Sequence, residues 1–469
     1  MKKIIRYTLI FSLAFFAAVG CKDIDTLNLN DPGRNGLLAT GSDLFKVLDA
    51  GYASWWQGVH GPAPAIALSV AADALTLGRE EFGALRMSAE PRKAYNNRIA
   101  EAEEYKQIAE GPWYGCLSAA ASANDVMAAM KEGISIDKGG PQDESALAAA
   151  HFLRGVSWGY LGLLFDRGLM VDEDDAPNEK ASFSDYRIMI GAAVGELEEA
   201  ITIAEALGPD FIHTSFHGLA LDAGQFSQLC HSYAARFLAQ WPRTMEENED
   251  VDWAAVQAHA EQGLQWDFAP MADGGLWQSY QQYAFAETGG DPFWARVDQR
   301  LVAALDRNQP TRYPEVEALG EDPLPNPTAQ SNDQRLASDF VFIPFNSFPA
   351  EAGEWHFSHY KHNRNQTAPD FAGDGHSAGP MPAFLSADNE LLKAEAMLRQ
   401  EDNAGAIAVL NAGTRVTRGG LPPFSAGTSG QALEQALLYE RAIELLNAAP
   451  MGAWFDRRRL APRLEYTEL

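Results

Sequence analysis

Helical periodicity is the feature that most constrains the fold of this chain. Apolar residues recur at three- and four-residue steps through most of the sequence, whereas the alternating pattern of a β-strand is scarce. The spacing predicts helices over the segments 42–57, 97–131, 145–165, 184–206, 224–240, 252–264, 387–400, 403–417 and 431–447. The predicted fold class is therefore mainly α.

Several of the predicted helices come in pairs, with small residues where two helices would cross closely. Ala394 in one helix and Ala406 in the next are examples. This pattern is typical of tetratricopeptide-like units, although long insertions break the period. We expect degenerate helix pairs over about 97–264 and 387–460. Between them, a stretch rich in Pro, Gly and aromatic residues predicts a loop-rich, ligand-side insertion over about 265–385.

The start of the chain has the layout of an export signal. Basic residues from Lys2 to Arg6 precede an apolar run that ends at Gly20. This run is shorter than the about 20 apolar residues that cross a bilayer. We expect residues 1–20 to be a lipoprotein signal peptide and Cys21 to be the lipidated residue that anchors the protein. The alternative is a conventional cleavage site beside an unmodified cysteine.

The charge balance excludes one class of partner. The chain has 64 acidic and 36 basic residues, a formal net charge of −28, so its acidic residues outnumber the cations that would neutralise nucleic-acid phosphates. The acidic runs 172–175 and 246–252 lack the ligand spacing of a calcium loop, and we expect them to be solvated loops. Beyond Cys21 the chain has only Cys116 and Cys230, each in an Ala-rich, helix-like setting, so two buried free thiols are expected in place of one bridge, and no Cys/His cluster indicates a zinc site.

One motif resembles a catalytic one but fails in context. The sequence GHSAG at 375–379 matches the nucleophile elbow of α/β-hydrolases. Pro369 precedes it where a buried strand is needed, and Pro380 follows it where a helix is needed. No histidine follows Ser377, although that family places its catalytic histidine later in the chain. We therefore expect no serine-hydrolase site at this motif.

Three histidines, His356, His359 and His362, raise the possibility of a metal site. The alternation of aromatic and polar residues around them indicates an extended segment, in which His359 points away from the other two. A polar rim or pocket wall is the expected role. The sequence predicts no metal and no cofactor.

Charged residues near the C-terminus predict structural ion pairs. Glu440 and Glu444 lie at helical spacing from Arg441, and Asp456 with the arginines that follow it is expected to hold the chain end. Ser386 is expected to cap the helix that begins beside it.

Several of these segments carry a resemblance to a known family. Residues 389–423 and 438–460, with 112–127 and 152–166 upstream, resemble the SusD/RagB family of nutrient-binding outer-membrane lipoproteins. The resemblance implies a SusD-like helical domain over 21–469 with tetratricopeptide-like units. It also implies a partner, a SusC-like TonB-dependent transporter, to which the protein passes glycan or peptide, and it implies no catalysis.

The predicted function is a surface-exposed binding lipoprotein of the outer membrane that faces the cell exterior and takes up nutrient. Two alternatives stay open: a tetratricopeptide-type scaffold that binds only protein, and a helical polysaccharide-degrading enzyme. Turnover of an oligosaccharide would favour the enzyme, and failure to bind any small ligand would favour the scaffold.

Candidate ligand-binding residues follow from the chemistry of sugars. Sugar rings present flat C–H faces that stack on aromatic rings, and their hydroxyls need polar donors and acceptors nearby. Two groups outside the repeat-like helices have this mixture; the alternative is that the rings are ordinary packing residues. The first group is Trp55, Trp56, Asp73 and Arg79, and the second is Trp277, Tyr280, Tyr283, Trp294, Trp355 and Tyr360.

Overall fold

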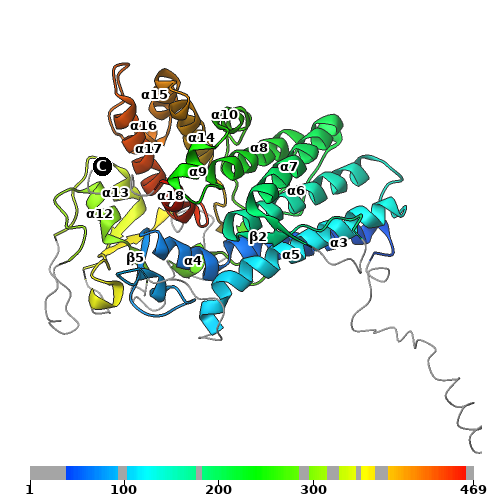
Figure 1. The fold of residues 1–469 in the computed structure, drawn as a ribbon, viewed down its shortest axis with the longest axis horizontal. Helices are drawn as coiled ribbons and strands as arrows, with labels where there is room; N and C mark the ends of the chain where they lie inside the picture. The colour runs from blue at the N-terminus through cyan, green and yellow to red at the C-terminus, as the bar shows by residue number, and fades with distance from the viewer. Residues whose placement is uncertain are drawn as a thin grey trace, which may run out of the picture.

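The structure is a computed structural model that describes residues 38–92, 103–175, 182–284, 295–313, 327–344, 350–364 and 379–460. Helices dominate these residues, so the predicted mainly-α class is confirmed (Figure 1). The longer helices are α3 (Gly41–His60), α4 (Pro62–Ala71), α5 (Glu103–Lys131), α6 (Pro141–Leu164), α7 (Tyr186–Leu207), α8 (Ala223–Gln240), α10 (Trp253–Glu261), α14 (Ser386–Arg399), α15 (Asn403–Ala412), α17 (Gly430–Glu444) and α18 (Gly452–Leu460). The shorter helices are α9 (Met245–Glu249), α11 (Tyr280–Ala284), α12 (Gln299–Leu305), α13 (Arg335–Asp339) and α16 (Thr414–Thr417), with 3₁₀ turns at Leu85–Ser88, Gly208–Asp210 and Ala350–Gly353.

Each segment predicted to be helical contains a helix, and the differences are local. The segment 403–417 divides at Gly413 into α15 and α16. Helix α4 escaped prediction because all but its first residue are buried, so it has no polar face and no amphipathic period. The acidic run 246–252, predicted to be a loop, instead contributes to α9. There the Thr244 side chain accepts a hydrogen bond from the Glu247 amide, and acidic residues favour a helix N-terminus.

The strands form two-stranded antiparallel sheets that join distant parts of the chain. The pairs are β1 (Leu75–Leu77) with β5 (Ala295–Val297), β2 (Arg167–Leu169) with β3 (Phe183–Asp185), β4 (Met271–Ala272) with β8 (Gly379–Pro380), and β6 (Phe340–Phe342) with β7 (Tyr360–His362). In the first sheet Leu75 lies opposite Val297. The stretch 265–385 thus contains short strands and helices as well as loops.

Apart from α4, which lies between α3 and α5 in the chain, the long helices pack in the order of the sequence. Helix α3 packs on α5, α5 on α6, α6 on α7 and α7 on α8, and the series continues through α10 and α14 to α15 and α17 (Figure 1). A repeat-like array buries its apolar faces in this way, between adjacent units. The large apolar core lies within this series, and Cys116 and Cys230 are buried in it as free thiols, as predicted.

Helices α3 and α5 approach so closely that their backbones touch. A Cβ atom added to Gly115 would lie 2.7 Å from the Cα of Gly58 and 2.8 Å from the carbonyl oxygen of Ser54. Real Cβ atoms do not approach backbone atoms this closely, so glycine is required at this crossing.

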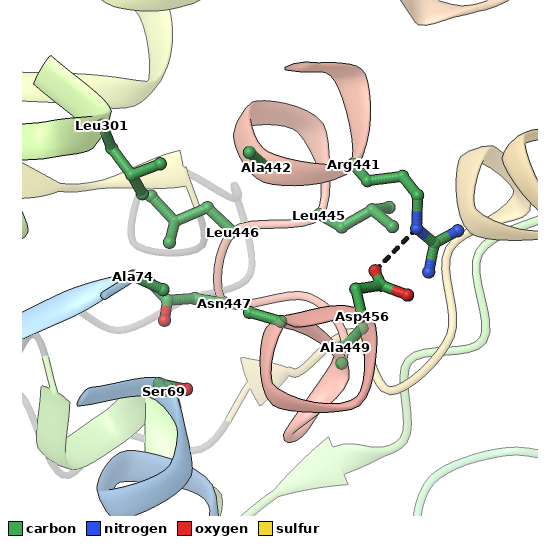
Figure 2. A pocket seen from close by; sticks show the side chains of 12 residues that line it. Ser69, Ala74, Leu301, Arg441, Ala442, Leu445, Leu446, Asn447, Ala449 and Asp456 are labelled. Carbon is green, nitrogen blue, oxygen red and sulfur yellow. Dashed lines mark hydrogen bonds and ion pairs between the residues drawn. The ribbon is translucent and has the colours of Figure 1, made fainter. Parts of the chain in front are cut away.

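The last helix is held in place by charged residues, as the sequence predicts. Arg441 donates to Asp456 at 2.7 Å, and Arg458 donates to the carbonyl oxygens of Leu163, Gln240 and Pro242. A cavity of about 30 Å³ lies between α4, α12, α17 and α18 (Figure 2). It has room for a water molecule or two but not for a sugar ring.

Helix α14 begins differently from the prediction. Ser386 does not cap it; instead Asp267 Oδ1 accepts hydrogen bonds from the amide and the hydroxyl of Ser386, both at 2.9 Å. An aspartate brought by a distant segment therefore adds its negative charge to that of Asp388 in the first turn. Among the described helices, none has both the length and the apolar content to span a bilayer.

Candidate functional site

A cleft of about 520 Å³ opens where α12 and α17 meet, and it is large enough for a small oligosaccharide. Four elements contribute to it: the end of α12, the segment 330–333, helix α16 with the loop after it, and one face of α17. The lining residues are Ala304, Leu305, Asp306, Arg307, Gln330, Ser331, Asn332, Asp333, Arg415, Leu421, Phe424, Ala432, Gln435, Ala436 and Tyr439.

Two aromatic rings line the cleft, and both are half-buried. Phe424 is fixed through its backbone, because its amide donates to Asn411 Oδ1 at 2.7 Å and its carbonyl accepts from Asn411 Nδ2 at 2.9 Å. The Arg415 guanidinium lies 4.5 Å from the centre of the Phe424 ring, within the range of a cation–π contact. Tyr439 projects from α17, and its hydroxyl donates to Asp333 at 2.8 Å. The rings are thus held at defined positions.

Asp306 positions one side of the cleft. Its carboxylate accepts hydrogen bonds from the amides of Gln330 at 2.8 Å and Asn308 at 3.0 Å. Burial favours the neutral acid, but these hydrogen bonds outweigh it and hold the pKa of Asp306 below its usual range. The carboxylate is therefore ionised while its oxygens are occupied by the protein itself.

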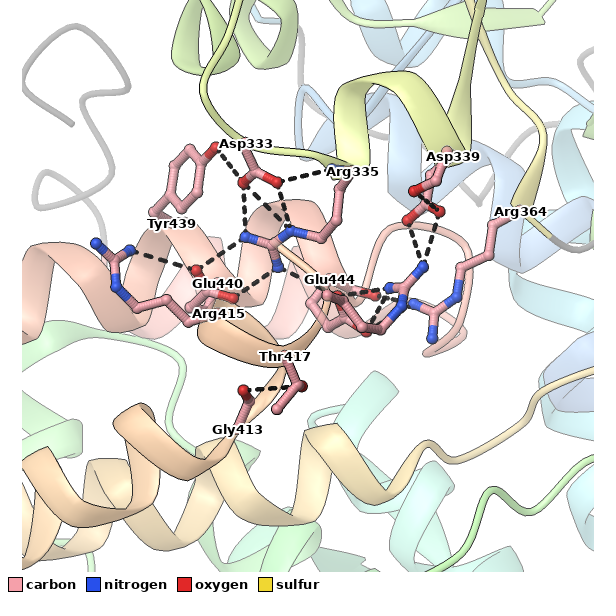
Figure 3. Close-up of polar contacts among 12 residues, drawn as sticks. Asp333, Arg335, Asp339, Arg364, Gly413, Arg415, Thr417, Tyr439, Glu440 and Glu444 are labelled. Atoms are coloured by element: carbon pink, nitrogen blue, oxygen red, sulfur yellow. Dashed lines mark hydrogen bonds and ion pairs between the residues drawn. The ribbon is translucent and has the colours of Figure 1, made fainter. Parts of the chain in front are cut away.

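A buried ion-pair network lies beside the cleft, centred on Arg335 (Figure 3). The Arg335 side chain is fully buried and donates to Asp333 at 2.7 Å, to Glu440 at 2.6 Å and to Glu444 at 3.1 Å. Burial opposes the charge of Asp333, but Arg335 outweighs it and lowers the pKa of that carboxyl. Burial and the neighbouring Asp333 both raise the pKa of Tyr439, so its hydroxyl stays protonated.

The network continues on the other side of Glu444. Arg418 donates to both Glu444 and Asp339 at 2.8 Å, and Arg364 donates to Glu444 at 2.9 Å. The partners of Glu440 and Glu444 thus come from distant segments and not from Arg441. Arg441 pairs with Asp456 and, at 3.4 Å, with Asp388. Asp333 lines the cleft and also belongs to this network. The network therefore holds the segment 330–333 against α17.

The sequence-predicted aromatic residues of α3 lie in the core. Trp55 and Trp56 have no exposed surface, and the Trp56 indole donates to the carbonyl of Gln278 at 2.8 Å. A ring without exposed surface cannot stack on a sugar, so packing is the role that the structure gives to both.

The second predicted group is also mostly buried. Trp277 contacts Trp56 with ring centres 5.1 Å apart, and Tyr280 and Tyr360 are buried as well. The Tyr360 hydroxyl accepts from the Ala329 amide at 2.6 Å, so Tyr360 supports the chain that leads into the cleft. Trp355 is half-buried and has a positive φ of 68°. The Trp294 residue and the Tyr283 side chain lie outside the described residues.

The two predicted charged residues, Asp73 and Arg79, lie in different environments. Asp73 is buried and pairs with Arg92, Arg300 and, at 2.6 Å, Arg457 of α18. Arg79 is exposed and pairs with Glu81 at 2.7 Å. Of the described side chains in both predicted groups, only Arg79 and Trp355 present appreciable surface to a ligand.

The three histidines do not form a rim. His356, His359 and His362 are all buried, and His359 Nδ1 lies 2.8 Å from the carbonyl oxygen of Ile343. Burial lowers the pKa of His362 to about 3 and keeps it neutral. No cluster of three metal-ligating side chains occurs among the described residues. The GHSAG motif at 375–379 lies almost entirely outside them.

Sequence reasoning missed the cleft aromatics Phe424 and Tyr439. Tyr439 lies within the predicted helix 431–447, and Phe424 lies between that helix and the predicted helix 403–417. A signal was present: Arg415 and Phe424 flank a loop that contains two glycines and two prolines. Loops of this kind on a helical scaffold often carry binding residues.

Comparison with models of protein families and with curated protein sequences gives no match. Solved structures do match. A SusD-like carbohydrate-binding protein from Bacteroides vulgatus is 14% identical, with a TM-score of 0.62 over 90% of this chain and 83% of that one. A protein solved with a xylogluco-oligosaccharide is 14% identical, with a TM-score of 0.59 over 91% and 85%. Surface glycan-binding protein A from Bacteroides uniformis is 14% identical, with a TM-score of 0.57 over 90% and 88%.

Proposed function

We propose that this chain, which has the SusD-like fold, binds glycan oligosaccharides. The fold that the sequence resemblance implied is confirmed, and it extends over nine-tenths of the chain. The observation that carries the proposal is this likeness to proteins described as carbohydrate-binding or solved with an oligosaccharide. The cleft between α12 and α17 supplies a place for the ligand.

The chemistry of the cleft fits a sugar. The ring faces of Phe424 and Tyr439 can stack on C–H faces, and the planar amides of Gln330, Asn332 and Gln435 can bond to hydroxyls. Alanine and leucine side chains complete the wall. The same mixture of residue types occurs in the sequence around Trp55 and Trp277, where most of the side chains are buried.

Binding without hydrolysis is the favoured activity. Glycoside hydrolysis requires two carboxyl groups available to the substrate, one as acid and one as base or nucleophile. The two carboxylates of the cleft, Asp306 and Asp333, accept hydrogen bonds from protein donors on both oxygens. Neither is free for that role.

We propose in addition that the protein is a lipoprotein of the outer membrane, anchored through Cys21 and facing the cell exterior. It would deliver its ligand to a SusC-like TonB-dependent transporter. The apolar run before Cys21 and the resemblance to the family support this. A peptide ligand in place of a glycan is the alternative within the same function.

Ligand binding is tested with two phenylalanine variants. Phe424→Ala removes a ring of the cleft, and Phe183→Ala removes an exposed ring on β3, outside the cleft. Calorimetry against a panel of oligosaccharides should show that Phe424→Ala weakens binding by about 1–3 kcal/mol while Phe183→Ala leaves it unchanged. Helical circular dichroism should be the same in both. Absence of binding to every oligosaccharide would contradict the proposed function. Equal affinity of both variants would exclude the cleft as the binding site.

Anchoring and partnership need a separate experiment. Mass spectrometry should find an acylated N-terminal Cys21, and Cys21→Ala should release the protein from membranes. Mild detergent extraction should co-purify a large β-barrel protein. An unmodified N-terminus at another residue would contradict the anchor, and recovery of this chain alone in several detergents would contradict the partnership.

A further inference from the structure

The charged groups of the cleft differ in what they offer a ligand. Its carboxylates, Asp306 and Asp333, are buried and accept hydrogen bonds from protein donors on both oxygens. Its cations, Arg307 and Arg415, do not direct all of their guanidinium N–H donors to protein acceptors. A ligand entering the cleft therefore meets guanidinium donors that are available and carboxylate oxygens that already accept hydrogen bonds from the protein.

Arg307 is the more available of the two cations. It follows the end of α12, its side chain is exposed, and it forms no ion pair or hydrogen bond with any described residue. The neighbouring Asp306 is ionised but accepts no hydrogen bond from Arg307, because its carboxylate oxygens accept from the amides of Gln330 and Asn308. Nothing in the described part of the chain explains the cation at this position by a structural role.

Arg415 is held in place but only weakly compensated. Its guanidinium packs on the Phe424 ring at 4.5 Å, which restricts its orientation. Its one ion-pair partner among the described residues is Glu440, at 3.5 Å, and that carboxylate already accepts two shorter hydrogen bonds from Arg335. The side chain keeps 15% of its surface exposed.

We infer that the cleft selects oligosaccharides that carry an anionic substituent, either a uronic carboxylate or a sulfate ester. This inference rests on the proposed glycan-binding function. A sugar ring stacked on Phe424 or Tyr439 would place its substituents beside the two arginines that line the same cleft. Guanidinium groups pair with carboxylate and sulfate-like oxyanions through two parallel hydrogen bonds, which neutral hydroxyls cannot match.

The net charge of the whole chain bears on this selectivity. The chain as a whole has a net charge of −28, so its surface repels acidic polymers at long range. An acidic glycan must therefore gain its affinity locally, from cations inside a cleft. Two arginines line one cleft whose described carboxylates direct their oxygens to protein donors, so guanidinium groups are the charged donors that an acidic substituent meets there.

The test uses oligosaccharides that differ only in charge. Oligogalacturonate is compared with its methyl-esterified form, and a sulfated galactan oligomer with its desulfated form, by calorimetry at low salt. We expect at least one acidic probe to bind about tenfold or more tightly than its neutral counterpart, the effect of one charge-assisted hydrogen bond. The preference should shrink as sodium chloride is added. The pair of probes distinguishes carboxylate from sulfate.

The variant Arg307→Gln should abolish most of that preference, with little change for the neutral probes. Its matched control is Arg167→Gln, which removes one exposed positive charge on β2, outside the cleft. The control should retain the wild-type preference. Arg415→Gln should also reduce it, and unfolding curves identify any loss of stability that Arg415→Gln causes.

The outcomes separate the two proposals. If neutral oligosaccharides bind and no acidic probe binds better, the inference fails and the glycan-binding function stands. If acidic probes are preferred equally by Arg307→Gln, Arg415→Gln and wild type, the selectivity lies elsewhere and the inference about this cleft is overturned. If no oligosaccharide of either kind binds, the proposed function itself fails.

Discussion

The helix series α3–α8 and the region around the cleft are stabilised by different means. The series buries large aromatic side chains such as Trp55, Phe152 and Tyr233 in one continuous apolar core. The region around α12, α13 and α17 has smaller apolar clusters and a buried network of arginines and carboxylates beside them. The comparison shows that one chain can rely on apolar packing in one part and on paired charges in another.

The difference follows from how each region is assembled. Successive helices of the series lie side by side, so each can bury an apolar stripe against its neighbour. The cleft region brings together segments that are far apart in the sequence, at Asp333, Arg364, Arg418 and Glu440. Long-range arginine–carboxylate pairs define the geometry of such a junction, although they add less net stability than apolar burial does.

The largest effect should come from breaking the network at its centre. Arg335→Met leaves Asp333, Glu440 and Glu444 buried with reduced compensation, and removal of one partner from a buried charge cluster costs about 3–5 kcal/mol. Urea unfolding followed by circular dichroism measures this. A loss below about 1 kcal/mol would show that the network contributes specificity without stability.

A pH series tests a second buried pair in the C-terminal region. Burial opposes ionisation of Glu395, but the two terminal guanidinium nitrogens of Arg459 each donate to its carboxylate at 2.7 Å. This pairing outweighs burial and lowers the pKa of Glu395 to about 2. A lowered carboxyl pKa adds stability above the unfolded value of about 4.5, and this stability is lost as the pH falls towards 2.

The variant Glu395→Gln should therefore be less stable than wild type by about 3 kcal/mol at pH 7, and the gap should narrow as the pH falls from about 4.5 towards 2. Unfolding free energies measured for both proteins across this range give the gap directly. A gap that does not change with pH would contradict the ionic origin of the effect.

The apolar series should respond to volume and not to pH. Gly115→Ala places a methyl group 2.7 Å from the Cα of Gly58, and overpacking of this kind costs about 1–3 kcal/mol. Gly111→Ala on the same helix is the matched control, because a Cβ there meets nothing within 4 Å. The control should be neutral or slightly stabilising, since alanine favours helix. Thermal unfolding compares the two, and equal effects would contradict a close α3–α5 crossing.

The smallest stability effect is expected at the exposed sequence-predicted site residue. Arg79→Ala breaks a surface ion pair with Glu81 and should change stability by less than about 0.5 kcal/mol. Its ligand affinity, measured together with that of Trp355→Ala, sharpens the comparison in a second way. Weakened binding in both would place a ligand contact outside the α12–α17 cleft, and unchanged binding would leave the cleft as the site.

The helices were largely predictable and the cleft was not. The apolar period of the sequence predicts amphipathic helices such as α5 and α8. The apolar helix α4 has no polar face, so its sequence lacks that period. The cleft depends on which distant segments meet: nothing in the sequence around Asp306 shows that its carboxylate will hold Gln330. Composition identified the right residue types, but burial separated them, because Trp55 and Trp56 fill the core while Phe424 faces a cleft.

The contacts of the last two long helices have a consequence for biogenesis. Ribosomes release a chain from its N-terminus, and Asp73 cannot meet Arg457 of α18 until nearly all of the described chain has emerged. The same holds for the cleft, which needs Tyr439 to close against Asp333. A nascent polypeptide therefore lacks the complete cleft until α17 has been synthesised, and any ligand that needs the cleft can bind only after that point.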